Sequence, residues 1–412
     1  MIVSAMTDVG RARTTNEDAF AIKDLASGKT IEALGKDHAI QIQERGVLLA
    51  LSDGMGGAEA GEVASALVLE SLQKALERSD RGEMHEQLES AVQRANRNVF
   101  FEAKMGDRQG MGATLVALFV RGDEAYIAEV GDSRGYILRK GRLRQITRDQ
   151  SLVQLLVDQG VMSEEEARSS PSKNVILQAM GLAKDVRVAI ARLRLRRGDR
   201  FLMCSDGVTN PISDEELQQI LTASDPRTAC ETMIALANER GGDDNQTAIV
   251  ADLDGDGLPP PDEFETVTET YEVLKRYDAT YKGKAVTPEI AQGVANVVRA
   301  KAATKSPIAT KGSERAKSES GTESLRKDVR TSDKSPSVGR PAPGAAAALN
   351  PDAPEPIHDP SPRAVITDRV PKMAPDEVAP ASVASRGKPT LLIIAVGVLA
   401  LVALIAIILV AT

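Results

Sequence analysis

The 412-residue sequence contains few of the residues on which several common kinds of site depend. Its two cysteines exclude a disulfide framework and a cysteine-rich zinc module. Tryptophan is absent and aromatic residues make up 3% of the chain, which argues against a carbohydrate-binding cleft or an RNA surface built on base stacking. The net charge of −8 excludes a globally basic nucleic-acid-binding protein. The chain has only three histidines, and they are scattered. Any catalytic site is therefore expected to depend on carboxylate side chains.

The composition divides the chain into three parts. Apolar runs alternate with turn signals through residues 1–254, which we expect to fold as one domain. Residues 255–390 are predicted to be a linker, with a short helix within 287–302. The Ala-, Pro-, Ser- and Lys-rich stretch 304–388 has too little apolar surface to offset its ordering entropy, so the linker is expected to be largely disordered.

Residues 391–410 form an uninterrupted apolar segment without a charged or polar side chain, LLIIAVGVLALVALIAIILV. As a helix, this segment would be roughly 30 Å long, which matches the hydrocarbon core of a bilayer. It is therefore predicted to be a single transmembrane helix. Arg386 and Lys388 precede it, and the N-terminus has no apolar leader, so the positive-inside rule places residues 1–390 in the cytoplasm.

Within residues 1–254 the pattern indicates an α+β domain. Turn residues separate short apolar runs, which favours antiparallel hairpins. Helical spacing of apolar residues predicts long helices over 59–76 and 84–104, and a helical hairpin over 151–169 whose second helix begins with the capping box Ser163–Glu166. Strands are predicted at 47–51, 113–120, 125–130, 136–139, 201–204 and 247–252.

Acidic residues recur beside glycine or asparagine, mostly where predicted strands end. Each taken alone is an ordinary turn or cap. As a set they suit convergence at one rim of the domain, where like charges would repel unless cations neutralised them. Oxygen ligands select Mg²⁺ or Mn²⁺, and two such ions can activate a water and clamp a phosphoryl group. The segments are Asn16-Glu17-Asp18, Asp53-Gly54, Gly131-Asp132, Ser205-Asp206-Gly207 and Asp243-Asp244-Asn245.

Six ordered motifs across residues 1–253 resemble the type 2C protein phosphatases, the metal-dependent PPM family, and especially its bacterial members. The resemblance implies an antiparallel β-sandwich flanked by helix pairs (α-β-β-α). It also implies hydrolysis of phosphoserine and phosphothreonine in proteins, opposing a Ser/Thr protein kinase. We further expect the catalytic domain to be a monomer and to bind no nucleic acid. The motifs are RTTNED at 13–18, DGMGG at 53–57, GMGATLV at 110–116, VGDSRGY at 130–136, CSDGV at 204–208 and DDNQT at 243–247.

The same resemblance implies roles for individual residues. Asp53 would bridge two Mn²⁺ or Mg²⁺ ions that share the attacking water. Asp206 and Asp244 would complete the first ion's shell, whereas Glu17 and the carbonyl of Gly54 would hold the second. Asp132 would join Asp206 at a third, weaker site. Asp18 would orient a metal-bound water, and Arg13 would bind the substrate phosphate.

Two departures from the family pattern affect this expectation. Met55 stands where animal enzymes have a histidine thought to be the general acid, and Ser170-Pro171 replaces a common His-Pro in the flap, residues 148–181. Cys204 is expected to be a buried structural residue, since no phosphoenzyme forms in this mechanism. The alternative function is a catalytically inactive phosphoprotein-binding or scaffold module at the membrane.

Overall fold

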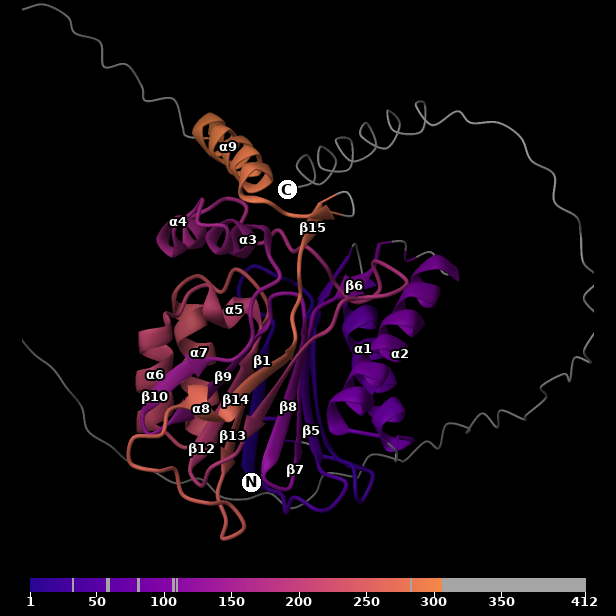
Figure 1. The fold of residues 1–412 in the computed structure, drawn as a ribbon, viewed down its shortest axis with the longest axis vertical. Coiled ribbons are helices and arrows are strands. Elements are labelled where there is room, and N and C mark those ends of the chain that lie inside the picture. Colours follow the sequence, from indigo (N-terminus) through magenta and orange to yellow (C-terminus); the bar gives the residue numbers. More distant parts are fainter. Residues whose placement is uncertain are drawn as a thin grey trace, which may run out of the picture. The chain divides into compact units, whose positions relative to one another are not determined.

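A computed structural model describes residues 1–31, 33–56, 60–79, 82–105, 108, 110–281 and 284–305. Two antiparallel sheets stack face to face, and helix pairs cover their outer faces (Figure 1). No helix within the described ranges is long and apolar enough to cross a membrane. Two predictions lie outside the described residues: the transmembrane segment 391–410, and the disorder expected over 304–388, apart from the first two residues of that stretch.

The first sheet has six strands and contains both ends of the predicted domain. N-terminal β1 pairs along its whole length with β13, so residues 2–8 lie beside residues 246–252. In sheet order, the strands are β10 (Arg142–Gln145), β9 (Arg134–Arg139), β12 (Asp199–Cys204), β13 (Gln246–Leu253), β1 (Ile2–Asp8) and β4 (His38–Ala39).

The second sheet has eight strands and is centred on β5, whose sequence VLLALSDGM begins as a continuous apolar run. Side chains alternate along a strand. Leu48 and Ala50 therefore face the outer helices, and Leu49 and Leu51 face the other sheet. The strands in order are β14 (Tyr271–Lys275), β11 (Ala189–Arg194), β8 (Glu124–Val130), β7 (Leu115–Arg121), β5 (Val47–Met55), β2 (Asp18–Asp24) and β3 (Lys29–Thr30), with β6 (Gly112–Ala113) paired to β5.

Three apolar cores hold these layers together. One lies between the two sheets and takes side chains from both, including Phe201 and Leu118. A second fills the space under α1 (Ala60–Glu77) and α2 (Met84–Met105), and a third lies under α6 (Asp214–Ala223) and α7 (Pro226–Glu239). The order helix, sheet, sheet, helix is the architecture that the sequence resemblance implies.

The flap connects β10 to β11 and contains α3 (Leu152–Asp158) and α4 (Glu164–Arg168). The capping box predicted for the second flap helix is confirmed: Ser163 and Glu166 exchange side-chain and backbone hydrogen bonds. Short α5 (Asp206–Thr209) follows β12 directly.

Ordered packing continues past residue 254, the predicted end of the domain. Helix α8 (Val267–Thr270) leads into β14, which pairs with β11 at the sheet edge. After the two-stranded β15 (Thr280–Tyr281) and β16 (Lys284–Ala285), α9 (Pro288–Lys305) occupies the region where the sequence predicts a short helix.

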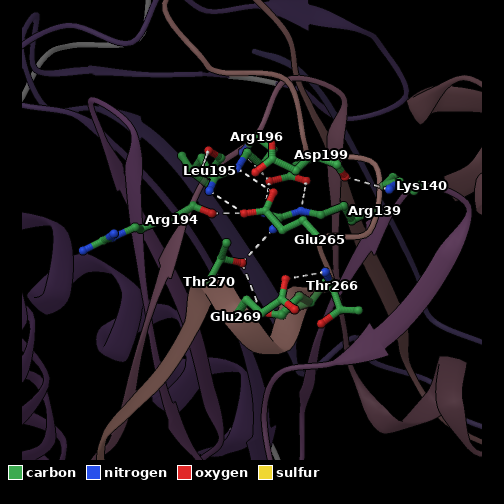
Figure 2. Close-up of polar contacts among 12 residues, drawn as sticks. Arg139, Lys140, Arg194, Leu195, Arg196, Asp199, Glu265, Thr266, Glu269 and Thr270 are labelled. Carbon is green, nitrogen blue, oxygen red and sulfur yellow. Dashed lines mark hydrogen bonds and ion pairs between the residues drawn. The ribbon is translucent and has the colours of Figure 1, made fainter.

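A buried ion pair fastens this extension to the domain. Both nitrogens Nε and Nη2 of Arg139 donate to the carboxylate of Asp199 at 2.6 Å, and Nη1 donates to Thr270 Oγ1 at 2.6 Å (Figure 2). Beside them, Arg196 binds Glu265 with two hydrogen bonds. Thr270 and Glu265 both lie beyond residue 254, so this segment is part of the folded unit rather than free linker.

Candidate active site

Asp18 begins β2 and lies directly opposite Asp53 on β5. Its Oδ2 accepts hydrogen bonds from Ser205 Oγ at 2.8 Å, just after β12, and from Thr247 Oγ1 at 2.7 Å, on β13 of the other sheet. Its Oδ1 is buried and has no hydrogen-bond partner. The carboxylate is thus fixed at one oxygen and free at the other, between the ends of the two sheets.

Asp53 lies near the end of β5, where its backbone is held on both sides by Thr114. The Asp53 N–H donates to Thr114 Oγ1 at 3.0 Å, and the Thr114 N–H donates to the Asp53 carbonyl at 2.8 Å. Thr114 Oγ1 also shares a hydrogen bond of 2.7 Å with Ser133, next to Asp132. These contacts connect the backbone around Asp53 to the loop that carries Asp132.

Gly54 and Gly61 meet where no side chain would fit. A Cβ on Gly54 would lie 2.1 Å from the Gly61 carbonyl oxygen, and one on Gly61 would lie 2.5 Å from Glu17 Oε1. The Gly54 N–H also donates to the Glu17 carbonyl at 3.0 Å. The two glycines therefore let the first turn of α1 approach the strand end and the Glu17 carboxylate.

Asp206 begins α5, immediately after β12. Its Oδ2 accepts from Asn210 Nδ2 at 3.0 Å, while its buried Oδ1 has no partner. It lies with Asp132 in the wall of a cavity of about 330 Å³, which we call the rim cavity. The flap residues Val153, Ala167 and Lys173 line this cavity as well.

Asp244 lies just before β13 and pairs with Arg13. Arg13 Nη2 is 3.0 Å from Asp244 Oδ2, and about half of the Arg13 side chain is exposed. The neighbouring Asn245 is buried and holds three segments together: its Oδ1 accepts from the Glu17 N–H, and its Nδ2 donates to the carbonyls of Val9 and Thr15.

The carboxylates are close enough to raise one another's pKa. Burial raises the pKa of Asp18 to about 7 and that of Asp206 to about 6, and the charge of Asp244 adds to both shifts. Burial, followed by the charge of Asp206, also raises the pKa of Asp132. For Asp53, burial raises the pKa well above its usual range, and neighbouring charges add to the shift: Asp18, Asp206, Asp132 and Asp244.

This group fits hard divalent cations in its chemistry. The donors are all oxygens, two buried carboxylate oxygens lack partners, and added positive charge would relieve the mutual repulsion. Within the described ranges, however, no three His, Cys, Asp or Glu side chains are arranged to hold one ion. The fit therefore rests on donor type, unpartnered oxygens and charge rather than on a completed ligand shell.

Several supporting residues were given no role of their own from the sequence. Asn245, Ser205, Thr247 and Thr114 all lie within the quoted motifs, but their roles depend on partners from distant segments. The motif DDNQT held the signal, since a buried asparagine between acidic residues and a strand is a common cap for neighbouring backbone groups. Cys204 is buried on β12, as predicted, and burial raises the pKa of its thiol.

The family model for protein phosphatase 2C matches residues 35–245, half of the chain. The chain belongs to the protein phosphatase 2C family. This 2C chain is 36% identical to the serine/threonine phosphatase stp of Listeria monocytogenes over 257 residues, which cover 60% of the chain and 94% of that protein. It is 41% identical over 207 residues to the serine/threonine protein phosphatase PstP of Mycobacterium tuberculosis, spanning only 40% of that protein's length.

Solved structures of 2C phosphatases have the same fold. The M. tuberculosis PstP/Ppp crystal structure matches with a TM-score of 0.54 at 36% identity, covering 62% of this chain and all of the other. The PstP catalytic domain in complex with two manganese ions matches with a TM-score of 0.52 at 35% identity, with the same coverage. The predicted family and antiparallel fold are confirmed.

Proposed function

We propose that this chain is a metal-dependent protein serine/threonine phosphatase. One observation carries the proposal: buried carboxylates with raised pKa values and two unpartnered oxygens meet where the two sheets end. Such a group is unfavourable by itself, and it becomes useful when divalent cations neutralise it. The relatives named as Ser/Thr phosphatases, one of them solved with two manganese ions, support this function.

We assign the metal-binding role to the residues predicted from the motifs. Two Mn²⁺ or Mg²⁺ ions would lower the pKa of a shared water and neutralise phosphoryl oxygens. A third, weaker ion would use Asp132 with Asp206. The residues for the first two ions are Asp53 for both, Asp206 and Asp244 for one, and Glu17 with the Gly54 carbonyl for the other.

Asp18 and Arg13 have different tasks in this proposal. Because Ser205 and Thr247 fix Asp18 Oδ2, its free Oδ1 could accept a hydrogen bond from a metal-bound water and orient it. The exposed Arg13 guanidinium can bind two phosphate oxygens, a geometry that arginine favours. Met55 carries no proton to donate to the leaving group, so general acid catalysis does not come from this position.

The substrates and location that we propose follow from the same assignment. Phosphorylated proteins are the substrate class, and a Ser/Thr protein kinase that phosphorylates them is the opposing partner. Residues 391–410 are proposed to anchor the chain in a membrane with the catalytic domain on the cytoplasmic side. Composition and the positive-inside rule support this arrangement.

The test is phosphate release by the purified full chain from a phosphothreonine peptide. Release that requires Mn²⁺ or Mg²⁺ and stops in EDTA supports the phosphatase. A sugar phosphate serves as the comparison, and faster turnover of it would indicate a small-molecule phosphatase instead. A folded chain that binds the phosphopeptide but releases no phosphate with either metal would favour the inactive binding or scaffold module.

A further inference from the structure

Helix α9 covers the apolar side of the flap. Its buried residues Ala291, Ala295 and Val298 share one face, with the spacing expected for a helix. They pack with flap residues in an apolar cluster that takes no member from either sheet among the described residues. The flap members of this cluster that are buried are Val153, Leu156, Met162 and Ala167.

A hydrogen bond fastens α9 to the turn between the flap helices. Arg299 Nη2 donates to the Val161 carbonyl at 2.9 Å and lies 3.4 Å from Glu166 Oε1. Val161 lies between α3 and α4, and Glu166 belongs to the capping box of α4. The contact therefore reaches α4 and the turn that precedes it, in addition to the apolar packing.

The same flap side chains face the candidate active site. Val153 and Ala167 belong to the cluster with α9 and also line the rim cavity, together with Asp132 and Asp206. Helix α3, which carries Val153, packs directly against α9, and both side chains belong to the same apolar cluster as the buried face of α9. The cavity wall and the helix are thus connected through this apolar cluster.

The chain that leads to α9 is held on the domain. Strand β14 pairs with β11, and Arg192 on β11 forms an ion pair with Glu272 of 2.6 Å. After β14 the Asp278 carbonyl accepts a hydrogen bond from Arg187. Helix α9 begins at Pro288, a short distance further along the chain, so this anchor keeps the helix close to the flap rather than leaving it to diffuse.

We propose that α9 is a positioning element for the flap. Its packing holds Val153 and Ala167 in the wall of the rim cavity and thereby sets how tightly a phosphorylated polypeptide binds, while a small aryl phosphate makes too few contacts to depend on it. This role rests on the proposed phosphatase function. It assigns to a segment beyond the predicted domain boundary a direct effect on substrate binding.

A matched pair of variants of the full chain tests the proposal. Ala295→Glu places a charge in the buried face of α9, and Val297→Glu places the same charge on the same helix at a position that is 56% exposed. The first readout is tryptic cleavage of the flap after Arg168 and Lys173, followed by mass spectrometry. The second is KM and kcat for a phosphothreonine peptide and for p-nitrophenyl phosphate.

In Ala295→Glu we expect flap cleavage to become about fivefold faster or more, because α9 no longer holds the flap and local opening becomes more frequent. The peptide KM should rise about threefold or more, with kcat/KM for p-nitrophenyl phosphate little changed. Val297→Glu should match the wild type. Arg299→Ala leaves the apolar face intact, so it should change the flap cleavage rate and the peptide KM in the same direction but by less than Ala295→Glu. If Ala295→Glu misfolds, Arg299→Ala tests the proposal in its place.

Equal cleavage rates in Ala295→Glu and Val297→Glu would overturn the proposal, as would faster cleavage without any change in the peptide KM. A wild-type chain without activity would contradict the proposed phosphatase function, independently of the role of α9. The cleavage rates alone would then decide whether α9 restrains the flap, since proteolysis does not depend on turnover.

Discussion

Asp18 and Asp53 face each other directly across the antiparallel pair β2–β5, two acidic side chains at one end of neighbouring strands. Like charges in this position oppose folding unless a cation or a proton lies between them. The protein keeps the arrangement although burial raises the pKa of both carboxyls. We infer that this repulsion destabilises the fold in the absence of cations, and that bound divalent cations would relieve it.

Asp18→Asn should therefore have opposite effects on stability and activity. Phosphate release should fall by about 10–100-fold, as for other residues that orient groups around a metal. In EDTA the variant should unfold about 2–4 °C higher than the wild type, since one buried charge is removed. Thermal unfolding in EDTA and a phosphopeptide assay with Mn²⁺ check the two halves.

Asp24 at the other end of β2 provides the control. Burial acts to raise the pKa of Asp24, but hydrogen bonds from Ser27 and Ala26 hold that pKa below its usual value. Asp24→Asn loses charge-assisted hydrogen bonds, so it should leave activity intact and stability unchanged or lower. A rise in the unfolding temperature in both variants would show that charge repulsion at the site is not the cause.

Glu129 gives a prediction for pH dependence away from the catalytic carboxylates. It is buried on β8, and burial raises its pKa well above the usual range, against the hydrogen bond from the Arg148 N–H. The unfolded chain loses this proton at a lower pH than the folded chain. Stability should therefore fall as pH rises from the unfolded pKa to the folded one.

Glu129→Gln removes this titration. The variant should be more stable than the wild type at neutral pH, by about 1.4 kcal/mol for each pKa unit of difference between the states. Its stability should also vary less with pH in urea titrations between about pH 5 and pH 8. Glu263→Gln, at an exposed position, should follow the wild-type curve. Parallel curves for wild type and Glu129→Gln would refute the assignment.

The buried pair Arg139–Asp199 should be the most sensitive polar contact outside the active site. Asp199→Ala leaves the Arg139 guanidinium buried without its carboxylate, which costs about 3–5 kcal/mol in comparable cases. The exposed pair Arg227–Glu231 is the reference, because Arg227→Ala should cost less than about 1 kcal/mol. Urea unfolding followed by circular dichroism measures both, and equal losses would contradict the structure.

Much of the sandwich could be predicted from local sequence. The expected strand at 47–51 is confirmed within β5, and the helices at 59–76 and 84–104 are confirmed as α1 and α2. Helices α6 and α7 were not predicted, although the same capping rule applies to them. Ser213 and Glu216 form a capping box, and Asp225 caps a helix that begins with Pro226.

Strand β14 shows what local sequence could not reveal. All of its residues are half-buried or exposed, so no alternation of buried apolar residues marks it. Its pairing is decided by β11, some eighty residues earlier in the chain. At the site, the acidic residues could be recognised by their motifs, whereas Ser205 and Thr247 gain their roles from Asp18 on the opposite sheet.

The most direct test of the central claim compares two adjacent aspartates. Asp244 is assigned to a metal and pairs with Arg13, whereas Asp243 is exposed and has no assigned role. With Mn²⁺ and a phosphothreonine peptide, Asp244→Asn should release phosphate more than about 100-fold more slowly than the wild type. Asp243→Asn should retain wild-type activity. Equal rates for the two variants would contradict the proposed metal-dependent mechanism.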